Sequence, residues 1–168
     1  MPTLQSTFDT VARHLLAQNA VSRYVNGCAY RGAHGRKCAV GCLISDEEYD
    51  SRMEGGAIMF NKPQEVNSQL VAAWAVKHGY NLALLAYLQS MHDGGCPEQW
   101  SAHLRGLAEG LGLATSVLDE FPDRCQDTER VSGKIVENIL RQQRELDQAG
   151  DLTSNAKGER SANDSGNV

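Results

Sequence analysis

The chain has 168 residues, 41% of them hydrophobic, which is enough for one domain with a substantial core and too few for two well-packed domains. Its formal net charge of −5 argues against a protein that binds nucleic acid by neutralising phosphates, because such proteins carry a surplus of Lys and Arg. We expect no membrane segment and a cytoplasmic location, since no run approaches the roughly 20 apolar residues that cross a bilayer and residues 1–10 lack a secretion signal.

The first predicted element is an amphipathic helix that begins at a capping box formed by Ser6 and Asp9 and ends near Gln18. A glycine-bounded turn follows at residues 32–35, because glycine adopts positive φ without steric cost. The short apolar run 38–44 after this turn is typical of a buried strand. The sequence therefore predicts a small β-hairpin with its tip in this turn.

Further along the chain, start and stop signals predict a series of helices. Ser45 and Glu48 form a second cap signature, so a short acidic helix should begin at Asp46. The other predicted helices carry apolar residues at helical spacing, and they span 61–78, 81–92, 97–111, 117–121 and 128–146. The expected fold class is mostly α: a single-domain helical bundle with one small β-hairpin, which is α+β in the strict sense.

Residues 147–168 differ in composition from the rest of the chain. They are polar, and Leu152 and Val168 are their only large apolar residues. Such a segment buries too little apolar surface to offset the entropy that ordering it would cost. We therefore expect one globular domain over residues 1–146 and a disordered C-terminal tail over residues 147–168.

The chain contains five cysteines, and three of them lie within residues 28–42. An odd count without regular disulfide spacing indicates reduced thiols. Cys28, His34, Cys38 and Cys42 are ligand types that bind zinc, but the spacing departs from the usual C-x2-C pair. Because free cysteine is also a common small core residue, we expect no metal or other cofactor, and a zinc-stabilised binding module stays as the third alternative.

A thiol active site is the second alternative. Arg36 and Lys37 precede Cys38 and would lower its pKa, whereas Cys42 lies shortly before a predicted helix start. The pair His92-Asp93 could act as a base with its orienting carboxylate. Against this, a histidine at a helix C-terminus is favourable without any catalytic role, and no nucleophile-elbow signature is present.

Two oppositely charged segments lie close together in the sequence. The basic segment contains Arg31, His34, Arg36 and Lys37, and the acidic segment contains Asp46, Glu47, Glu48, Asp50 and Glu54. Opposed charged patches are suited to steering the encounter with a protein partner. We therefore expect these side chains to face water as a recognition surface, while the neighbouring cysteines pack inward.

The stretch YRGAHGRKCAVGCLISDEEYD is followed by LQSMHD and later by W-x3-L-x2-L-A-x2-L-G-L. In these motifs the chain resembles a group of small uncharacterised proteins of bacteriophage and prophage genomes. The resemblance covers roughly residues 4 to 113, and its most specific part is residues 30–50. The resemblance implies a similar hairpin, Cys-rich strand and acidic helix start. It implies that the protein comes from a phage or prophage, but it implies no activity.

From these observations we expect a non-enzymatic phage or prophage accessory protein that binds and modulates a host factor, including a defence or transcription component. The expected partner is a host protein in the host cytoplasm, not nucleic acid or a membrane. The second alternative is a cysteine-dependent hydrolase or transferase that uses Cys38 or Cys42 with His92. The third alternative is the zinc-stabilised binding module.

Overall fold

The computed structural model describes residues 1–25, 27–58, 66–121 and 129–162, with side chains through residue 150. Within these ranges the protein is mostly helical and has a single two-stranded antiparallel hairpin, so the predicted fold class is confirmed. The helices are α1 (Leu4–Gln18), α2 (Val66–Lys77), α3 (Leu82–Gly94), α4 (Pro97–Leu111), α5 (Ser116–Asp119) and α6 (Gly133–Ala162). The strands are β1 (Arg23–Tyr24) and β2 (Gly27–Cys28), and the 3₁₀ turns are η1 (Ala33–Gly35) and η2 (Ser51–Met53).

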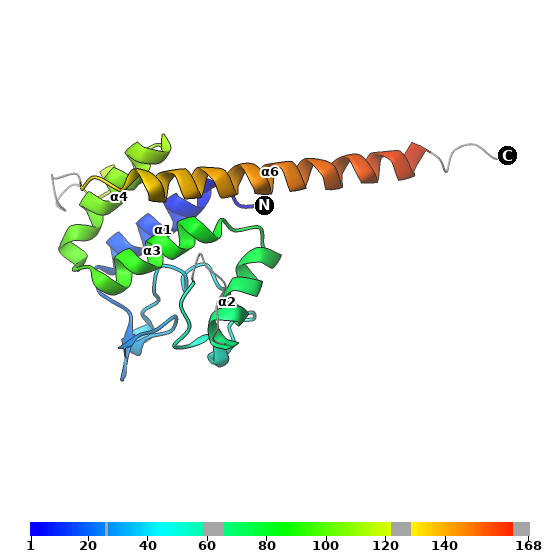
Figure 1. Ribbon diagram of the computed structural model, residues 1–168. Helices are drawn as coiled ribbons and strands as arrows, with labels where there is room; N and C mark the ends of the chain where they lie inside the picture. Colours follow the sequence, from blue (N-terminus) through cyan, green and yellow to red (C-terminus); the bar gives the residue numbers. More distant parts are fainter. Residues whose placement is uncertain (26, 59–65, 122–128, 163–168) are drawn as a thin grey trace.

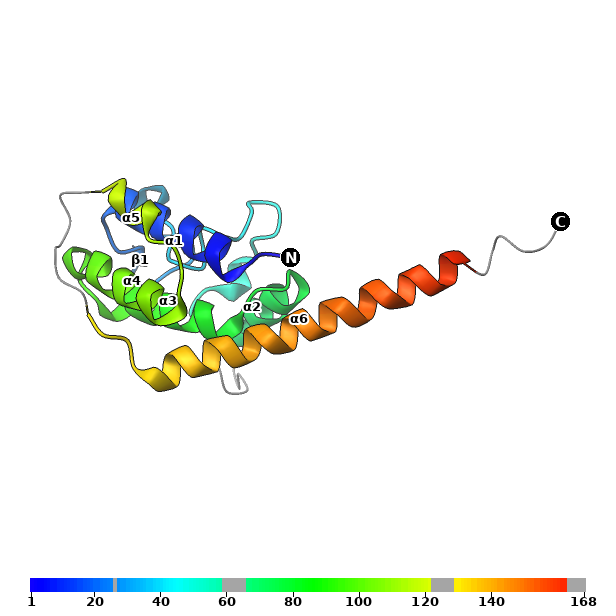
Figure 2. The same cartoon turned by 90° about the horizontal axis from the view of Figure 1, so that it is seen from above.

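Helices α1, α3, α4 and α6 pack together as a bundle, with α5 against α1 (Figures 1 and 2). Helix α2 and the irregular segment 29–58 lie on the other side of α3. The β1–β2 hairpin projects from this second part, away from the helices, at the lower left of Figure 1. The fold therefore presents the hairpin as a protrusion from the body of the protein.

Two buried apolar clusters meet on α3. The bundle cluster includes Phe8, Leu15, Leu84, Leu88, Trp100, Leu104, Leu107 and Ile139. The second cluster includes Tyr30, Cys38, Val40, Ile44, Val71, Trp74 and Leu85. Because Leu84 and Leu88 lie on one face of α3 and Leu85 points into the other cluster, α3 is covered on both sides.

Helix ends follow local capping rules, with one difference from the prediction. Helix α1 begins one turn earlier than Ser6: the Thr3 side chain accepts from the Ser6 amide, and the Ser6 hydroxyl accepts from the Thr3 amide. Asp9 instead accepts a hydrogen bond from Gln5, so the predicted Ser6–Asp9 capping box is wrong. Two other predicted helix starts are confirmed, since Asn81 caps α3 and Pro97 opens α4.

The hairpin forms in a different place from the prediction. Tyr24 pairs with Gly27 and Arg23 with Cys28, upstream of the glycine-bounded turn. That turn does reverse the chain, as η1 closed by an Arg31–Lys37 bridge.

The predicted strand 38–44 is wrong. The Cys42 amide donates to the Cys38 carbonyl and the Leu43 amide to the Val40 carbonyl, so the segment winds as a helical turn. Gly41 has Tyr30 backbone atoms so close that a Cβ at this position would lie 2.2 Å from the Tyr30 carbonyl oxygen. The apolar run is thus buried by tight packing of a turn and not by strand pairing.

The predicted acidic helix at Asp46 is also wrong. The Glu48 and Tyr49 amides both donate to the Ser45 carbonyl, which makes a single turn. The chain then becomes extended at Asp50, whose carboxylate accepts from the Arg52 amide and starts η2. The Asp50 cap competes with the turn that begins at Ser45, which explains why that turn does not extend into a helix. The predicted start of the next helix, at residues 61–63, lies outside the described residues.

Helix α6 is longer than the predicted last helix, which was expected to end near residue 146. It packs on α3 and α4 and then continues beyond the body of the protein to Ala162 (Figure 2). A helix already started by tertiary packing can extend through polar residues, because each added residue gains a backbone hydrogen bond without a new nucleus. The division of the chain at residue 146 stays a prediction. In the described part of the chain, no helix combines the length and apolarity needed to span a bilayer.

Candidate functional site

The two charged segments of the sequence pair largely with each other. Arg31 Nη2 donates to the Ile44 carbonyl oxygen at 2.7 Å and lies 2.9 Å from Asp46 Oδ1. Lys37 Nζ lies 3.3 Å from the same carboxylate oxygen. These contacts join the turn after β2 to the turn at residues 46–48. The charged groups of Arg31, Lys37 and Asp46 are therefore engaged in contacts within the protein.

Glu48 of the acidic segment is also engaged within the protein. Its carboxylate accepts from Trp74 Nε1 at 3.3 Å and lies 2.7 Å from His78 Nε2 and 3.5 Å from Lys77 Nζ. The Trp74 N–H, together with these neighbours, lowers the pKa of Glu48. Glu48 thus anchors the turn to α2.

Of the predicted recognition residues, His34, Arg36 and Glu47 are exposed without such contacts among the described residues. The loop that carries the first two is fixed beside the hairpin, since the Ser22 hydroxyl donates to the Ala29 carbonyl at 2.8 Å and the Arg36 carbonyl at 3.1 Å. Fewer of the predicted recognition residues are therefore free of contacts within the fold, and the loop that carries His34 and Arg36 lies next to β1.

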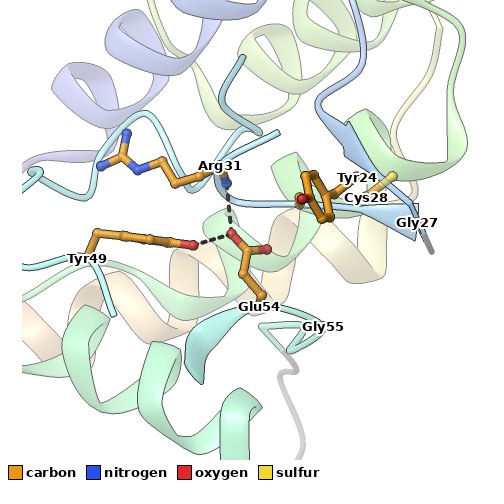
Figure 3. A pocket seen from close by; sticks show the side chains of 8 residues that line it. Tyr24, Gly27, Cys28, Arg31, Tyr49, Glu54 and Gly55 are labelled. Carbon is orange, nitrogen blue, oxygen red and sulfur yellow. Dashed lines mark hydrogen bonds between the residues drawn. The ribbon is translucent and has the colours of Figure 1, made fainter. Parts of the chain in front are cut away.

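Glu54, the last carboxylate of the predicted acidic segment, organises the segment after the hairpin (Figure 3). Its Oε1 accepts from the Arg31 amide at 2.9 Å and from the Tyr49 hydroxyl at 2.7 Å, and its Oε2 accepts from the Tyr30 amide at 3.0 Å. Burial and this bond raise the pKa of Tyr49 to about 12. The sequence identified Glu54 only as a surface charge, because two of its donors, the Tyr30 and Arg31 amides, lie more than twenty residues away in the chain.

Tyr30 extends the same network into the interior. Its hydroxyl donates to the Gly56 carbonyl at 2.8 Å and accepts from Gln89 Nε2 at 3.2 Å. Gln89 in turn accepts from the Ile58 amide. Burial raises the pKa of Tyr30, in keeping with its position in the second cluster. The segment around Glu54 is thereby tied to α3.

A pocket of about 430 Å³ opens between the hairpin and the segment that carries Glu54. Tyr24 and Cys28 line its hairpin side, and Arg31, Tyr49 and Glu54 line the other (Figure 3). The Arg31 guanidinium extends over the Tyr49 ring, with Cζ 5.1 Å from the ring centroid. The pocket combines aromatic walls with a carboxylate. The sequence-based candidates include its Arg31, Cys28 and Glu54, but no sequence pattern predicted that they line one pocket.

The two cysteines of the predicted thiol site are packing residues. Cys38 is 1% exposed, and its sulfur accepts from the Gly41 amide at 3.2 Å. Cys42 donates to the Ala39 carbonyl oxygen at 3.2 Å. Burial raises the pKa of both thiols to about 12. Neither is activated by the basic residues that precede it, although a nucleophile requires a lowered pKa.

His92 is fully buried at the end of α3, stacked on Trp100 with ring centroids 5.3 Å apart. Its Nε2 accepts a hydrogen bond from the Ser22 amide at 3.1 Å, so the proton lies on Nδ1, which faces Asp93 Oδ1 at 2.7 Å. Both ring nitrogens are occupied. His92 therefore ties the start of the hairpin to α3 and has no free lone pair with which to act as a base.

The structure groups Cys28, not Cys38 or Cys42, with His92 and Asp93. Their ligand atoms lie within 4.8 Å of one another, and this is the one such group of three in the described part of the chain. The predicted zinc ligand His34 is exposed in η1, apart from this group.

The Cys28 group is better explained by hydrogen bonding than by metal ligation or thiol catalysis. A metal ion on either His92 nitrogen would displace the Ser22 or the Asp93 bond. The Cys28 thiol donates to the Asp93 carbonyl oxygen at 3.8 Å, and burial together with Asp93 raises its pKa to about 11. Both the tautomer of His92 and the protonation of Cys28 favour a structural group.

These thiol environments predict a pattern of alkylation. Among the four cysteines in the described ranges, iodoacetamide at neutral pH should modify the exposed Cys96 first. It should modify Cys28 about 100-fold more slowly than an ordinary thiol, because the pKa of Cys28 is about 11 instead of 9.0. Cys38 should react more slowly still because it is buried. Peptide mass spectrometry over time measures each rate, and the Cys28 rate should rise with pH toward 11. Alkylation of Cys28 or Cys38 faster than free glutathione would contradict this assignment.

Comparisons with protein-family models, curated proteins and solved structures return no match to this chain. Function must therefore be argued from the surface and chemistry of the chain itself.

Proposed function

We propose that the chain is a small phage or prophage accessory protein that binds and modulates a host factor through its β1–β2 hairpin. The observation that carries the proposal is the exposure of two large apolar side chains on this protrusion: Tyr24 is 68% exposed and Val25 is 86% exposed. The phage setting rests on the resemblance of residues 30–50 described above. The binding role rests on the hairpin.

The hairpin has the composition of a protein contact. An exposed tyrosine supplies large contact area at a low cost in side-chain entropy, and aromatic and Arg residues are enriched at binding hot spots. Arg23 is exposed on β1, and the loop that carries Arg36 is fixed next to it through Ser22. An apolar tip with a charged rim is the usual anatomy of a protein interface.

The position of the hairpin on the fold supports the same role. Hydrogen bonds anchor its base, since the Ser22 amide donates to His92 and the Ala29 amide donates to the Ser22 carbonyl. Among the described residues, each of its two strands pairs only with the other. A rigidly anchored protrusion reduces the ordering cost of binding.

The proposal is tested by recovering partners from a bacterial host lysate on immobilised protein. Val25→Asp should reduce recovery of the specific partner at least about tenfold, because it places a charge in the centre of the contact. Val76→Asp on α2 is the matched control, since Val76 is a valine of 62% exposure on another element. It should leave recovery unchanged.

Two results would contradict the proposal. Equal recovery by the wild type and Val25→Asp would remove the hairpin from the contact. Loss of recovery in Val76→Asp alone would assign binding to the exposed side of α2 instead. Charge reversal of Arg31 or Lys37 is a poor test, because both pair with Asp46 within the fold.

A further inference from the structure

We propose that the pocket beside the hairpin receives the ammonium group of a lysine side chain from the partner. This inference rests on the proposed binding function and names the chemistry of the contact. It is carried by the Glu54 carboxylate, whose partners within the described residues are all neutral, and by the tyrosines on either side of it (Figure 3).

Glu54 brings a negative charge to the pocket that no ion pair offsets. Its hydrogen-bond donors are the amides of Tyr30 and Arg31 and the hydroxyl of Tyr49. The Arg31 guanidinium pairs with Asp46 instead and points away from Glu54 in Figure 3. Among the described residues, therefore, Glu54 is a preorganised carboxylate without a cationic partner.

The hydrogen bonds that Glu54 already accepts determine whether an ammonium or a guanidinium group fits its carboxylate better. Counting donors in the described part of the chain, Oε1 accepts two bonds and Oε2 accepts one, which leaves one acceptor position, on Oε2. A guanidinium binds a carboxylate best through two parallel bonds and would need a free position on each oxygen. An ammonium acts as a compact point charge and needs only one acceptor. The geometry therefore favours lysine over arginine.

The aromatic walls favour the same ligand. Tyr49 and Tyr24 lie on opposite sides of Glu54 (Figure 3). Arg31 already occupies one face of the Tyr49 ring, which shows that this wall accommodates a cation. The Tyr24 ring is largely exposed and has no ring partner among the described residues. Attraction between an ammonium and an aromatic face adds to the pull of the carboxylate.

Arg23 is a second cation near the pocket, and its charge restricts where another cation can bind. The charge of Arg23 acts on the Cys28 thiol, on the hairpin side of the pocket. The anionic part of the pocket is therefore its Glu54 side, and the lysine should enter between Tyr24 and Glu54. The lysine would contact the inner side of the hairpin while the partner's apolar surface contacts the tip at Val25.

The test uses a lysine side-chain mimic as the probe. ¹⁵N-labelled protein is titrated with butylammonium, with propylguanidinium and with neutral butanol, at a constant ionic strength made up with sodium chloride. Butylammonium should shift the amide signals of Tyr30 and Arg31, which donate to Glu54, in a saturable way. Propylguanidinium should bind more weakly, and butanol should leave these signals unchanged.

Variants assign the effect to the pocket. Glu54→Gln removes the charge and should weaken butylammonium binding about tenfold. Tyr24→Leu leaves the Glu54 network intact and should weaken it several-fold, which covers the case in which Glu54→Gln fails to fold. Val25→Asp should not weaken it, since Val25 does not line the pocket.

The outcomes separate this inference from the function it rests on. Absence of saturable shifts with butylammonium, or equal shifts with butanol, would overturn the lysine pocket even where Val25→Asp abolishes partner recovery. Tighter binding of propylguanidinium would overturn the choice of lysine. Saturable binding that is lost in Tyr24→Leu would support the pocket even where no partner is recovered.

Discussion

Gly41→Ala should lower the free energy of unfolding by at least about 3 kcal/mol. A Cβ at this position would lie 2.2 Å from the Tyr30 carbonyl oxygen, and 2.9 Å and 3.0 Å from two further Tyr30 backbone atoms. Backbone cannot rotate away as a flexible side chain can. The turn that carries Cys38 and Cys42 would therefore separate from Tyr30, and the second apolar cluster would open.

Urea denaturation monitored by tryptophan fluorescence measures this loss, because Trp74 belongs to the same cluster. Gly94→Ala is the matched control, since no atom lies within 4 Å of the Cβ position and Gly94 closes α3. It should be neutral or stabilising by up to about 1 kcal/mol. Equal denaturation midpoints for wild type and Gly41→Ala would contradict the close packing of the turn.

Glu54→Ala should cost about 3 kcal/mol of stability. It leaves the buried Tyr30 amide and the half-buried Arg31 amide without an acceptor, and it removes the partner of the Tyr49 hydroxyl. The loss should exceed that of an ordinary surface carboxylate because unpaired buried donors pay their full desolvation penalty. The variant should also shift the titration of Tyr49 down from about 12.

Glu47→Ala is the control for this prediction, since Glu47 is an exposed glutamate in the neighbouring turn. Its free energy of unfolding should lie within about 0.5 kcal/mol of the wild type. Thermal and urea denaturation of both variants, with ultraviolet titration of the tyrosines, measure the difference. A Glu54→Ala protein as stable as Glu47→Ala would contradict the role of Glu54 as the centre of this network.

Local sequence signals predicted the helices well, because helix ends depend on neighbouring residues. Asn81 and Pro97 mark true helix starts, and Gly112 ends α4 at a φ of 66°. The predicted hairpin position was wrong, because local signals do not determine which segments pair as strands. The glycines at positions 32 and 35 do form a turn, but strand pairing depends on distant contacts such as the Ser22 amide with His92, which no local pattern reveals.

The candidate site was predicted only in part. The burial of Cys38 was predicted correctly, because free cysteine is a frequent core residue. The charges were expected to face water. The Asp46 side chain is 81% exposed, but the Arg31 side chain that pairs with it across two turns is only 17% exposed. Glu54 was predicted as a surface charge, but its network was not, because the Tyr30 and Arg31 amides reach it only through the tertiary fold.

The central claim is that the protein acts by docking its hairpin onto a partner. It is tested most directly by placing a photo-crosslinking residue at position 25 in one protein and at position 76 in another, both exposed sites. Irradiation in host lysate should give a discrete crosslinked product from position 25 that untagged wild-type protein competes away, and none from position 76. A competable product from position 76 with none from position 25 would contradict the claim.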